Sequence, residues 1–349
     1  MLRRDGAAEA LFAALEGTDR LVLLGDSLEL RNRRVREVLE ASEPFFRALG
    51  DALGDRRLVI VAGNHDHALV ERWLAGREQP LGLEQRIAPE NASDLAAALA
   101  AQMPGANVEL AYPGIWLRED VYATHGHYLD VHMTVPTIER IAISVSGRLA
   151  LEGGSGRWSD VHSPDDYESL LAPVYAWSHM AAQSGRPGQA TAGGAAIRAW
   201  RTLRSARGGG ARARALAAAF PLAVSTLNAA GLGPLSSELS GEELRRAGLR
   251  AISEVVERLR IRARHVVFGH THRAGMLEGD IAAEWLTPNG VQLHNTGSWV
   301  YSQTFLDKGD PRSPYWPGSA VLIEDGAPPE LLRLLADRPA GELSGVRSA

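Results

Sequence analysis

Cysteine is absent from this chain of 349 residues. Disulfide bonds, thiolate metal sites and cysteine nucleophiles are therefore excluded. The chain also lacks a run of about 18 consecutive apolar residues, which a membrane-spanning helix requires. Its first residues are basic but are not followed by the long apolar segment of a signal peptide. We therefore expect a cytoplasmic protein, with contact at a membrane surface as an alternative.

Lysine is nearly absent as well, because Lys308 is the only one. The formal net charge of −5 gives no reason to expect nucleic acid as a partner. The apolar fraction of 45% supports a sizeable core, and the length suffices for a large domain with an insertion or for two domains.

Four short apolar runs each end in polar residues that can bind a metal ion. Runs of this length predict buried strands, and α/β folds place their sites at strand ends. One such residue alone is more often a helix cap or a solvated histidine, but repetition at four strand ends favours a metal site. The runs 21–24, 58–62, 121–124 and 266–268 lead to Asp26, to Asn64 and His65, to His125, and to His270 and His272.

These candidate ligands are oxygens and imidazoles, a set that suits Mn²⁺, Fe²⁺, Zn²⁺ or Co²⁺. A carboxylate such as Asp26 can bridge two cations, and paired cations activate water for displacement at phosphorus. His65 is placed to act as general acid for the leaving oxygen, and Asp66 to orient and charge it. We therefore expect a site for two divalent metal ions, or for one in the chain as given.

The motifs GDSLE at 25–29, GNHD at 63–66, HGH at 125–127 and GHTHR at 269–273 resemble, in this order, those of the calcineurin-like metallophosphoesterases. The resemblance implies a four-layer α/β/β/α sandwich of two mixed sheets. It implies that Asp26 bridges the metals, that His272 serves one of them, and that His65 and Asp66 form the transition-state pair. The ligands that it implies for the other metal are Asn64, His125 and His270.

One motif of that family is missing. The family begins with an Asp-x-His motif at the end of its first strand, whereas no histidine precedes His65 here. We expect that the chain as given starts downstream of that strand, which would leave Leu21–Leu24 with an unpaired edge. The alternative is a degenerate relative that binds one metal or is inactive.

The expected organisation is a core of residues 1–134 and 256–337, a helical cap insertion at 135–255 and a disordered tail at 338–349. Within the core, Pro113-Gly114 predicts a hairpin turn between strands at 108–112 and 115–118. Helices are expected at 6–17 and 31–53 from their apolar spacing.

The insertion is rich in arginine and contains no acidic residue from Ser169 to Ser237. Four arginines spaced by three lie on one side of an expected helix, beside an apolar stretch at 215–235. They form either a solvated face or a cap that attracts an anionic ligand, and the apolar stretch either packs inside the cap or meets a membrane or an acyl chain. These arginines are Arg198, Arg201, Arg204 and Arg207.

GDxxE and GHTHR also resemble the UDP-2,3-diacylglucosamine hydrolase branch, which has a cap for acyl chains but usually carries arginine in place of His65. We therefore expect a metallophosphoesterase that hydrolyses a phosphomonoester, phosphodiester or pyrophosphate bond in a phosphorylated small molecule or lipid-like substrate. The alternative is a non-catalytic scaffold that binds a partner or a membrane surface through its arginine-rich cap.

Overall fold

The computed structural model describes residues 5–134, 161–184, 241–301, 306 and 309–344. The chain divides into two compact units, residues 1–127 with 261–349 and residues 128–260. The expected arginine stripe and the apolar stretch at 215–235 lie outside the described residues.

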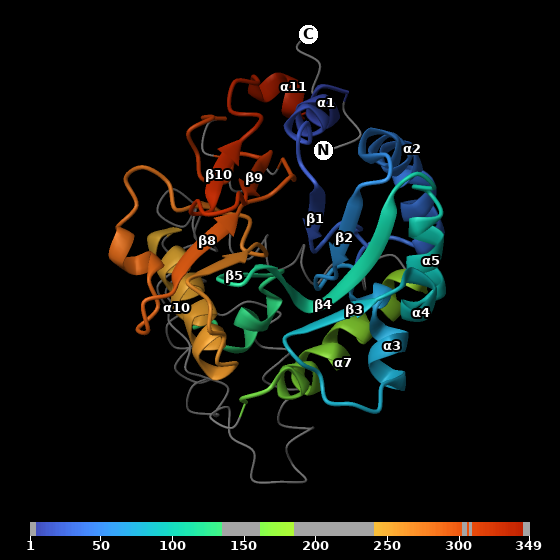
Figure 1. The fold of residues 1–349 in the computed structure, drawn as a ribbon, viewed down its shortest axis with the longest axis horizontal. Coiled ribbons are helices and arrows are strands. Elements are labelled where there is room, and N and C mark those ends of the chain that lie inside the picture. Colours follow the sequence, from blue (N-terminus) through green and yellow to red (C-terminus); the bar gives the residue numbers. More distant parts are fainter. Residues whose placement is uncertain (1–4, 135–160, 185–240, 302–305, 307–308, 345–349) are drawn as a thin grey trace, which may run out of the picture. The chain divides into compact units, whose positions relative to one another are not determined.

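The first unit is built on a mixed eight-stranded sheet, so the chain is an α/β protein (Figure 1). Its strands follow the order β1-β2-β4-β5-β6-β8-β7, with β3 paired to β4. The pairs β1–β2, β2–β4, β5–β6 and β6–β8 are parallel, so the strands within each parallel group have their carboxyl ends on the same side of that part of the sheet. The strands are β1 (Arg20–Leu24), β2 (Arg57–Val61), β3 (Glu84–Ile87), β4 (Asn107–Arg118), β5 (Val121–Thr124), β6 (His265–Phe268), β7 (Ala274–Gly275) and β8 (Gln292–Thr296).

The hairpin expected at 108–118 is wrong, because Asn107–Arg118 forms one continuous strand, β4. Its first half pairs with β2 in parallel, and its second half pairs with β5 in the antiparallel sense. Gly114 lies where β4 meets β5, and a Cβ there would come within 2.5 Å of the carbonyl oxygen of Ala123. Pro113 and Gly114 thus mark a change of partner strand and not a turn.

Side chains alternate between two apolar clusters on the faces of β2. Leu58 and Ile60 pack with residues of α1, α2 and α5 on one face. Val59 and Val61 pack on the other face with residues of β5 and β6, so the two ends of the curled sheet share a core. The helices and 3-10 turns of this unit are α1 (Asp5–Ala14), α2 (Val35–Leu53), η1 (His67–Leu69), α3 (Glu71–Gly76), α4 (Pro89–Ala92), α5 (Asp94–Ala100), η5 (Ala282–Trp285) and α11 (Ala340–Ser344).

A second sheet has two antiparallel strands, β9 (Ser319–Leu322) and β10 (Glu330–Arg333). Part of the tail that was expected to be disordered is ordered, because Ala340–Ser344 forms α11. Leu343 of this helix is buried in a cluster with Trp316 and Leu335. Burial of one apolar residue on a short helix is a tertiary contact that the polar composition of the tail does not predict.

The second unit contains the helices α7 (Pro164–Gln183) and α10 (Gly241–Arg258). Helix α7 begins with a capping box in which Ser163 and Asp166 exchange hydrogen bonds. Tyr167 of this helix is fully buried and stacks on Tyr128, with the ring centroids 4.6 Å apart. None of the helices in the described part of the chain is long and apolar enough to cross a membrane.

Candidate metal centre

The residues that follow strands β1, β2, β5 and β6 lie close together. Asp26 follows β1, Asn64 follows β2, His125 follows β5 and His270 follows β6. The ligand atoms of Asp26, His125 and His270 all lie within 4.8 Å of one another, so this cluster could hold a metal ion. Within the cluster, Oδ2 of Asp26 lies 3.3 Å from Nε2 of His125.

Asn64 completes the cluster and is almost fully buried. Its inward amide atom lies 3.3 Å from Nε2 of His125, from Nδ1 of His270 and from both carboxylate oxygens of Asp26. With its nitrogen inward the amide donates to Asp26, and its oxygen accepts from Arg31. With its oxygen inward it faces only acceptors, which is favourable when a cation lies between them. The Asn64 amide can therefore face an empty site with its nitrogen inward and a site that holds a cation with its oxygen inward.

The backbone of these loops is held in an uncommon conformation. Asp26, His270 and His272 have φ angles of 53°, 65° and 61°, in the left-handed region that residues with a side chain rarely adopt. Such backbone strain clusters at functional sites, where surrounding contacts maintain it.

Two glycines allow the ligands to approach closely. A Cβ at Gly25 would lie 2.1 Å from Nδ1 of His125, and one at Gly63 would lie 2.3 Å from Oδ1 of Asp26. No side chain fits at either position without displacing a ligand, so both glycines are required by the geometry of the cluster.

A backbone carbonyl group fixes the orientation of the His125 ring. Its Nδ1 lies 2.8 Å from the carbonyl oxygen of Leu24, so that nitrogen donates and Nε2 turns toward the cluster. Burial alone would raise the pKa of Asp26, but the imidazoles of His125 and His65 hold that pKa well below its usual value. Asp26 is therefore an anion, the form in which a carboxylate binds a cation.

The loop that carries His270 and His272 is supported by Asn295 from β8. The Asn295 amide donates to the hydroxyl of Thr271 at 2.8 Å. His272 lines the same cavity as Asp26 but is not one of the three residues with mutually close ligand atoms. Burial lowers the pKa of His272 to about 4, which leaves its ring neutral and able to bind a cation.

His65 stands beside the cluster, with its Nε2 4.0 Å from Oδ2 of Asp26. Its Nδ1 lies 2.8 Å from the Glu29 carboxylate. Burial would lower the pKa of His65, but the charge of Asp26 and the hydrogen bond to Glu29 raise it to about 9. The ring is therefore protonated near neutral pH and can donate a proton to a leaving oxygen.

The orienting contact that was expected from Asp66 comes from Glu29 instead. The Asp66 carboxylate accepts hydrogen bonds from backbone N–H groups, which join the loop after β2 to the loop after β1. Sequence reasoning missed Glu29 as the partner of His65, although the GDSLE motif contains it. The four donors are Gly63 at 2.6 Å, Ser27 at 2.7 Å, and Asp26 and Leu28 at 3.2 Å each.

Carboxylate, amide and imidazole donors that converge in a buried site fit a divalent transition metal ion. The donors closest together are Asp26, Asn64, His125 and His270, and His272 stands farther along the cavity wall. No protein-family model and no curated protein sequence gives a significant match to the chain.

Proposed function

We propose that this chain is a metal-dependent phosphoesterase of the calcineurin-like kind, which hydrolyses a phosphomonoester, phosphodiester or pyrophosphate bond. The observation that carries the proposal is a cluster of metal-ligand side chains with the imidazole of His65 beside it, 4.0 Å from the carboxylate of Asp26. A ligand cluster alone would suit a structural metal, whereas the adjacent acid suits bond cleavage.

Asp26, Asn64, His125 and His270 would hold one divalent cation, and Asp26 with His272 would contribute to a second. Such cations supply a Lewis acid and lower the pKa of bound water. Asp26 remains an anion because the neighbouring imidazoles stabilise its charge. His65 holds a proton on the ring that Glu29 orients, and it donates this proton to the leaving oxygen.

The finer fold belongs to the same proposal. We infer that the two ends of the curled sheet form the facing sheets of a four-layer sandwich, with the shared core around Val59 and Val61 as supporting evidence. The substrate would be a phosphorylated small molecule or a lipid-like molecule. The metal cluster would act on its phosphoryl group and does not determine the rest of its structure.

The test is hydrolysis of bis-p-nitrophenyl phosphate by the full chain with Mn²⁺, together with metal content by mass spectrometry. We expect bound metal and metal-dependent turnover, both strongly reduced in Asp26→Ala. His162→Ala serves as the matched control, since His162 is exposed and remote in sequence from the cluster. Hydrolysis that is unchanged in Asp26→Ala would refute the proposal.

A non-catalytic or one-metal protein is the second candidate. It is favoured by the position of His272 outside the three-membered group of the described residues. This candidate predicts about one metal ion per chain and no turnover of any phosphoester. The same two measurements therefore separate the candidates.

A further inference from the structure

A pair of facing histidines lies on strands β6 and β8, apart from the metal cluster. His265 is the first residue of β6, and His294 lies within β8. The two strands pair in parallel with Val267 opposite His294, so the two histidines are diagonal neighbours on one face of the sheet. The cluster residue His270 follows the carboxyl end of β6, whereas His265 begins the strand at its amino end.

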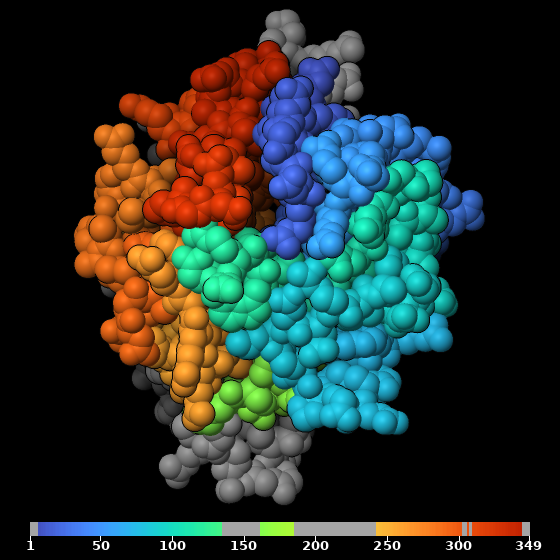
Figure 2. All heavy atoms as spheres, viewed as in Figure 1, coloured from blue at the N-terminus to red at the C-terminus, as the bar shows by residue number. Residues whose placement is uncertain are grey.

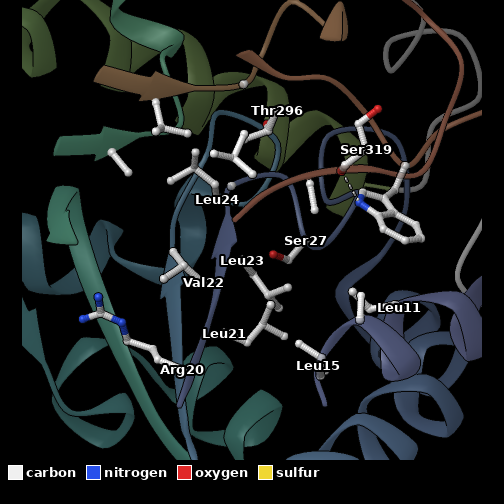
Figure 3. A pocket seen from close by; sticks show the side chains of 18 of the residues that line it. Leu11, Leu15, Arg20, Leu21, Val22, Leu23, Leu24, Ser27, Thr296 and Ser319 are labelled. Atoms are coloured by element: carbon white, nitrogen blue, oxygen red, sulfur yellow. Dashed lines mark hydrogen bonds between the residues drawn. The ribbon is translucent and has the colours of Figure 1, made fainter. Parts of the chain in front are cut away.

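The metal cluster and the histidine pair do not share a cavity. The cavity that contains Asp26 and His272 runs beside β1 and has a volume of about 1160 Å³. Figure 2 shows a recess between the blue residues of α1 and β1 and the red residues near the carboxyl end. Figure 3 shows the apolar side chains of β1 in this cavity. Neither His265 nor His294 lines it, so an ion bound between them would be separate from the ions of the cluster.

The distance between the two rings suits two ligands of one metal ion. Nδ1 of His265 lies 3.1 Å from Nε2 of His294, and the ring centroids are 5.2 Å apart. Imidazole nitrogens bind Zn²⁺ at about 2.0–2.1 Å. Two such bonds from one ion place the nitrogens about 2.9 Å apart when they meet at a right angle and about 3.3 Å apart in a tetrahedron. The observed separation lies between these two values.

Both rings are in the protonation state that metal binding requires. Burial lowers the pKa of His265, although the charge of Asp120 opposes this shift. Burial and the charge of His265 lower the pKa of His294 to about 4. Each ring is therefore neutral near neutral pH and offers a lone pair to a cation. Both rings are also partly exposed, so an ion can reach them from solvent.

The charges around the pair indicate which class of ion it would bind. The Asp120 carboxylate accepts a hydrogen bond from Arg118 at 2.6 Å, and Arg118 also donates to the carbonyl oxygen of Ala327. The charges of Arg264 and Arg118 act on His265 in the opposite sense to Asp120. Because these charges are of both signs, the affinity must come from the imidazoles, which suit zinc, copper and nickel better than magnesium or calcium.

We propose that His265 and His294 together bind one transition metal ion of the class that prefers imidazole, represented by Zn²⁺, with water in its remaining positions. The ion joins β6 to β8. Both strands support the loop of His270, since that loop follows β6 and Asn295 of β8 donates to the hydroxyl of Thr271. This proposal does not depend on the proposed function, because neither histidine belongs to the metal cluster.

The test removes the cluster and keeps the pair. The full chain with Asp26→Ala and His270→Ala loses two ligands of the cluster and serves as the background. His294→Gln is added to this background, and His162→Gln is the matched control, since His162 is exposed and belongs to the other unit. Each protein is equilibrated with Zn²⁺, and its metal content is measured by mass spectrometry. Electron paramagnetic resonance with Cu²⁺ then counts the nitrogen ligands.

We expect the background to bind about one Zn²⁺ per chain, His162→Gln to retain it and His294→Gln to lose it. Bound Cu²⁺ should show two nitrogen ligands in the background and fewer after His294→Gln. Zn²⁺ should raise the urea midpoint of unfolding only where the pair is intact, because an ion that binds the folded chain stabilises it.

A background that binds no Zn²⁺, or one whose Zn²⁺ content His294→Gln leaves unchanged, would overturn the proposal. The two rings would then be joined by a hydrogen bond alone. The same substitution in the otherwise unaltered chain covers the case in which the background does not fold. There His294→Gln should lower the metal content by about one ion per chain, and an equal content would overturn the proposal as well.

Discussion

Strands β1 and β2 have nearly the same sequence, Arg-Leu-Val-Leu-Leu and Arg-Leu-Val-Ile-Val, and pair in parallel without offset. Four of the five residues of β2 are buried, whereas all five residues of β1 are only half-buried. Strand β2 lies between β1 and β4, while β1 has the cavity on its other side. The comparison teaches that the sequence of a strand specifies its conformation, and its neighbours decide how much of it is buried.

The loops that follow the two strands differ in chemistry. The loop after β1 supplies Asp26 and Glu29, both carboxylates. The loop after β2 supplies Asn64, His65 and Asp66. The loops depend on each other, because Glu29 orients His65 and Asp66 accepts hydrogen bonds from the backbone of the loop after β1. The site is therefore a product of both strands.

The largest expected effect is on turnover, and it distinguishes the role of His65, in the loop after β2, from that of the ligand His270. His65→Ala should retain metal and reduce kcat by roughly 10²–10⁴-fold, the usual contribution of a general acid. His270→Ala should lose metal as well as turnover. Metal content and kcat on bis-p-nitrophenyl phosphate check both variants. Wild-type kcat in His65→Ala would show that this imidazole donates no proton.

The next effect tests the link between the two loops. Asp66→Ala should lower the free energy of unfolding by about 3–5 kcal/mol, because it leaves several buried N–H groups unsatisfied. Asp66→Asn keeps one acceptor oxygen and should cost less. Urea denaturation measures both. If the two variants were equally stable, the carboxylate would not be the element that joins the loops.

A smaller effect tests the comparison of the strands directly, at residues that lie opposite each other in the ladder. Ile60→Ala in β2 should cost about 3 kcal/mol, as is usual for a fully buried side chain. Leu23→Ala in β1 should cost about 1 kcal/mol, because that side chain lines the cavity beside β1 and is only partly buried. Thermal or urea unfolding gives the difference, and equal costs would contradict the open edge of β1.

A pH-dependent effect is expected at the parallel pair β6–β8, away from the two loops. Nδ1 of His265 lies 3.1 Å from Nε2 of His294, and burial together with His265 lowers the pKa of His294 to about 4. The unfolded chain binds a proton there near pH 6.5 and the folded chain does not, so stability is lost as pH falls from about 6.5 toward 4.

The slope from this group is at most about 1.4 kcal/mol per pH unit. His294→Gln should reduce the dependence of unfolding free energy on pH over this range relative to the unaltered chain. Urea denaturation at several pH values measures it. An identical dependence in the two proteins would show that His294 is protonated equally in both states.

Several elements follow from local sequence. The apolar runs at 21–24, 58–62, 121–124 and 266–268 form strands within one or two residues of the expected bounds, because period and composition are local signals. Strands β3 and β10 were not predicted. Glu84–Ile87 is mostly polar and forms a strand because β4 offers it a partner.

The sequence by itself determined which side chains stand at each strand end: Asp26, Asn64, His125 and His270 follow apolar runs that must become strands. Only the tertiary structure decided which carboxylate contacts His65 and which side of β1 stays open. Both depend on distances across separate loops and between strands far apart in the chain, and no local pattern encodes such distances. Parallel pairing aligned the strand ends within each part of the sheet, and the core shared by β2, β5 and β6 brought the two parts together. The backbone hydrogen bonds to Asp66 hold the loops so that Glu29, and not Asp66, contacts the imidazole of His65.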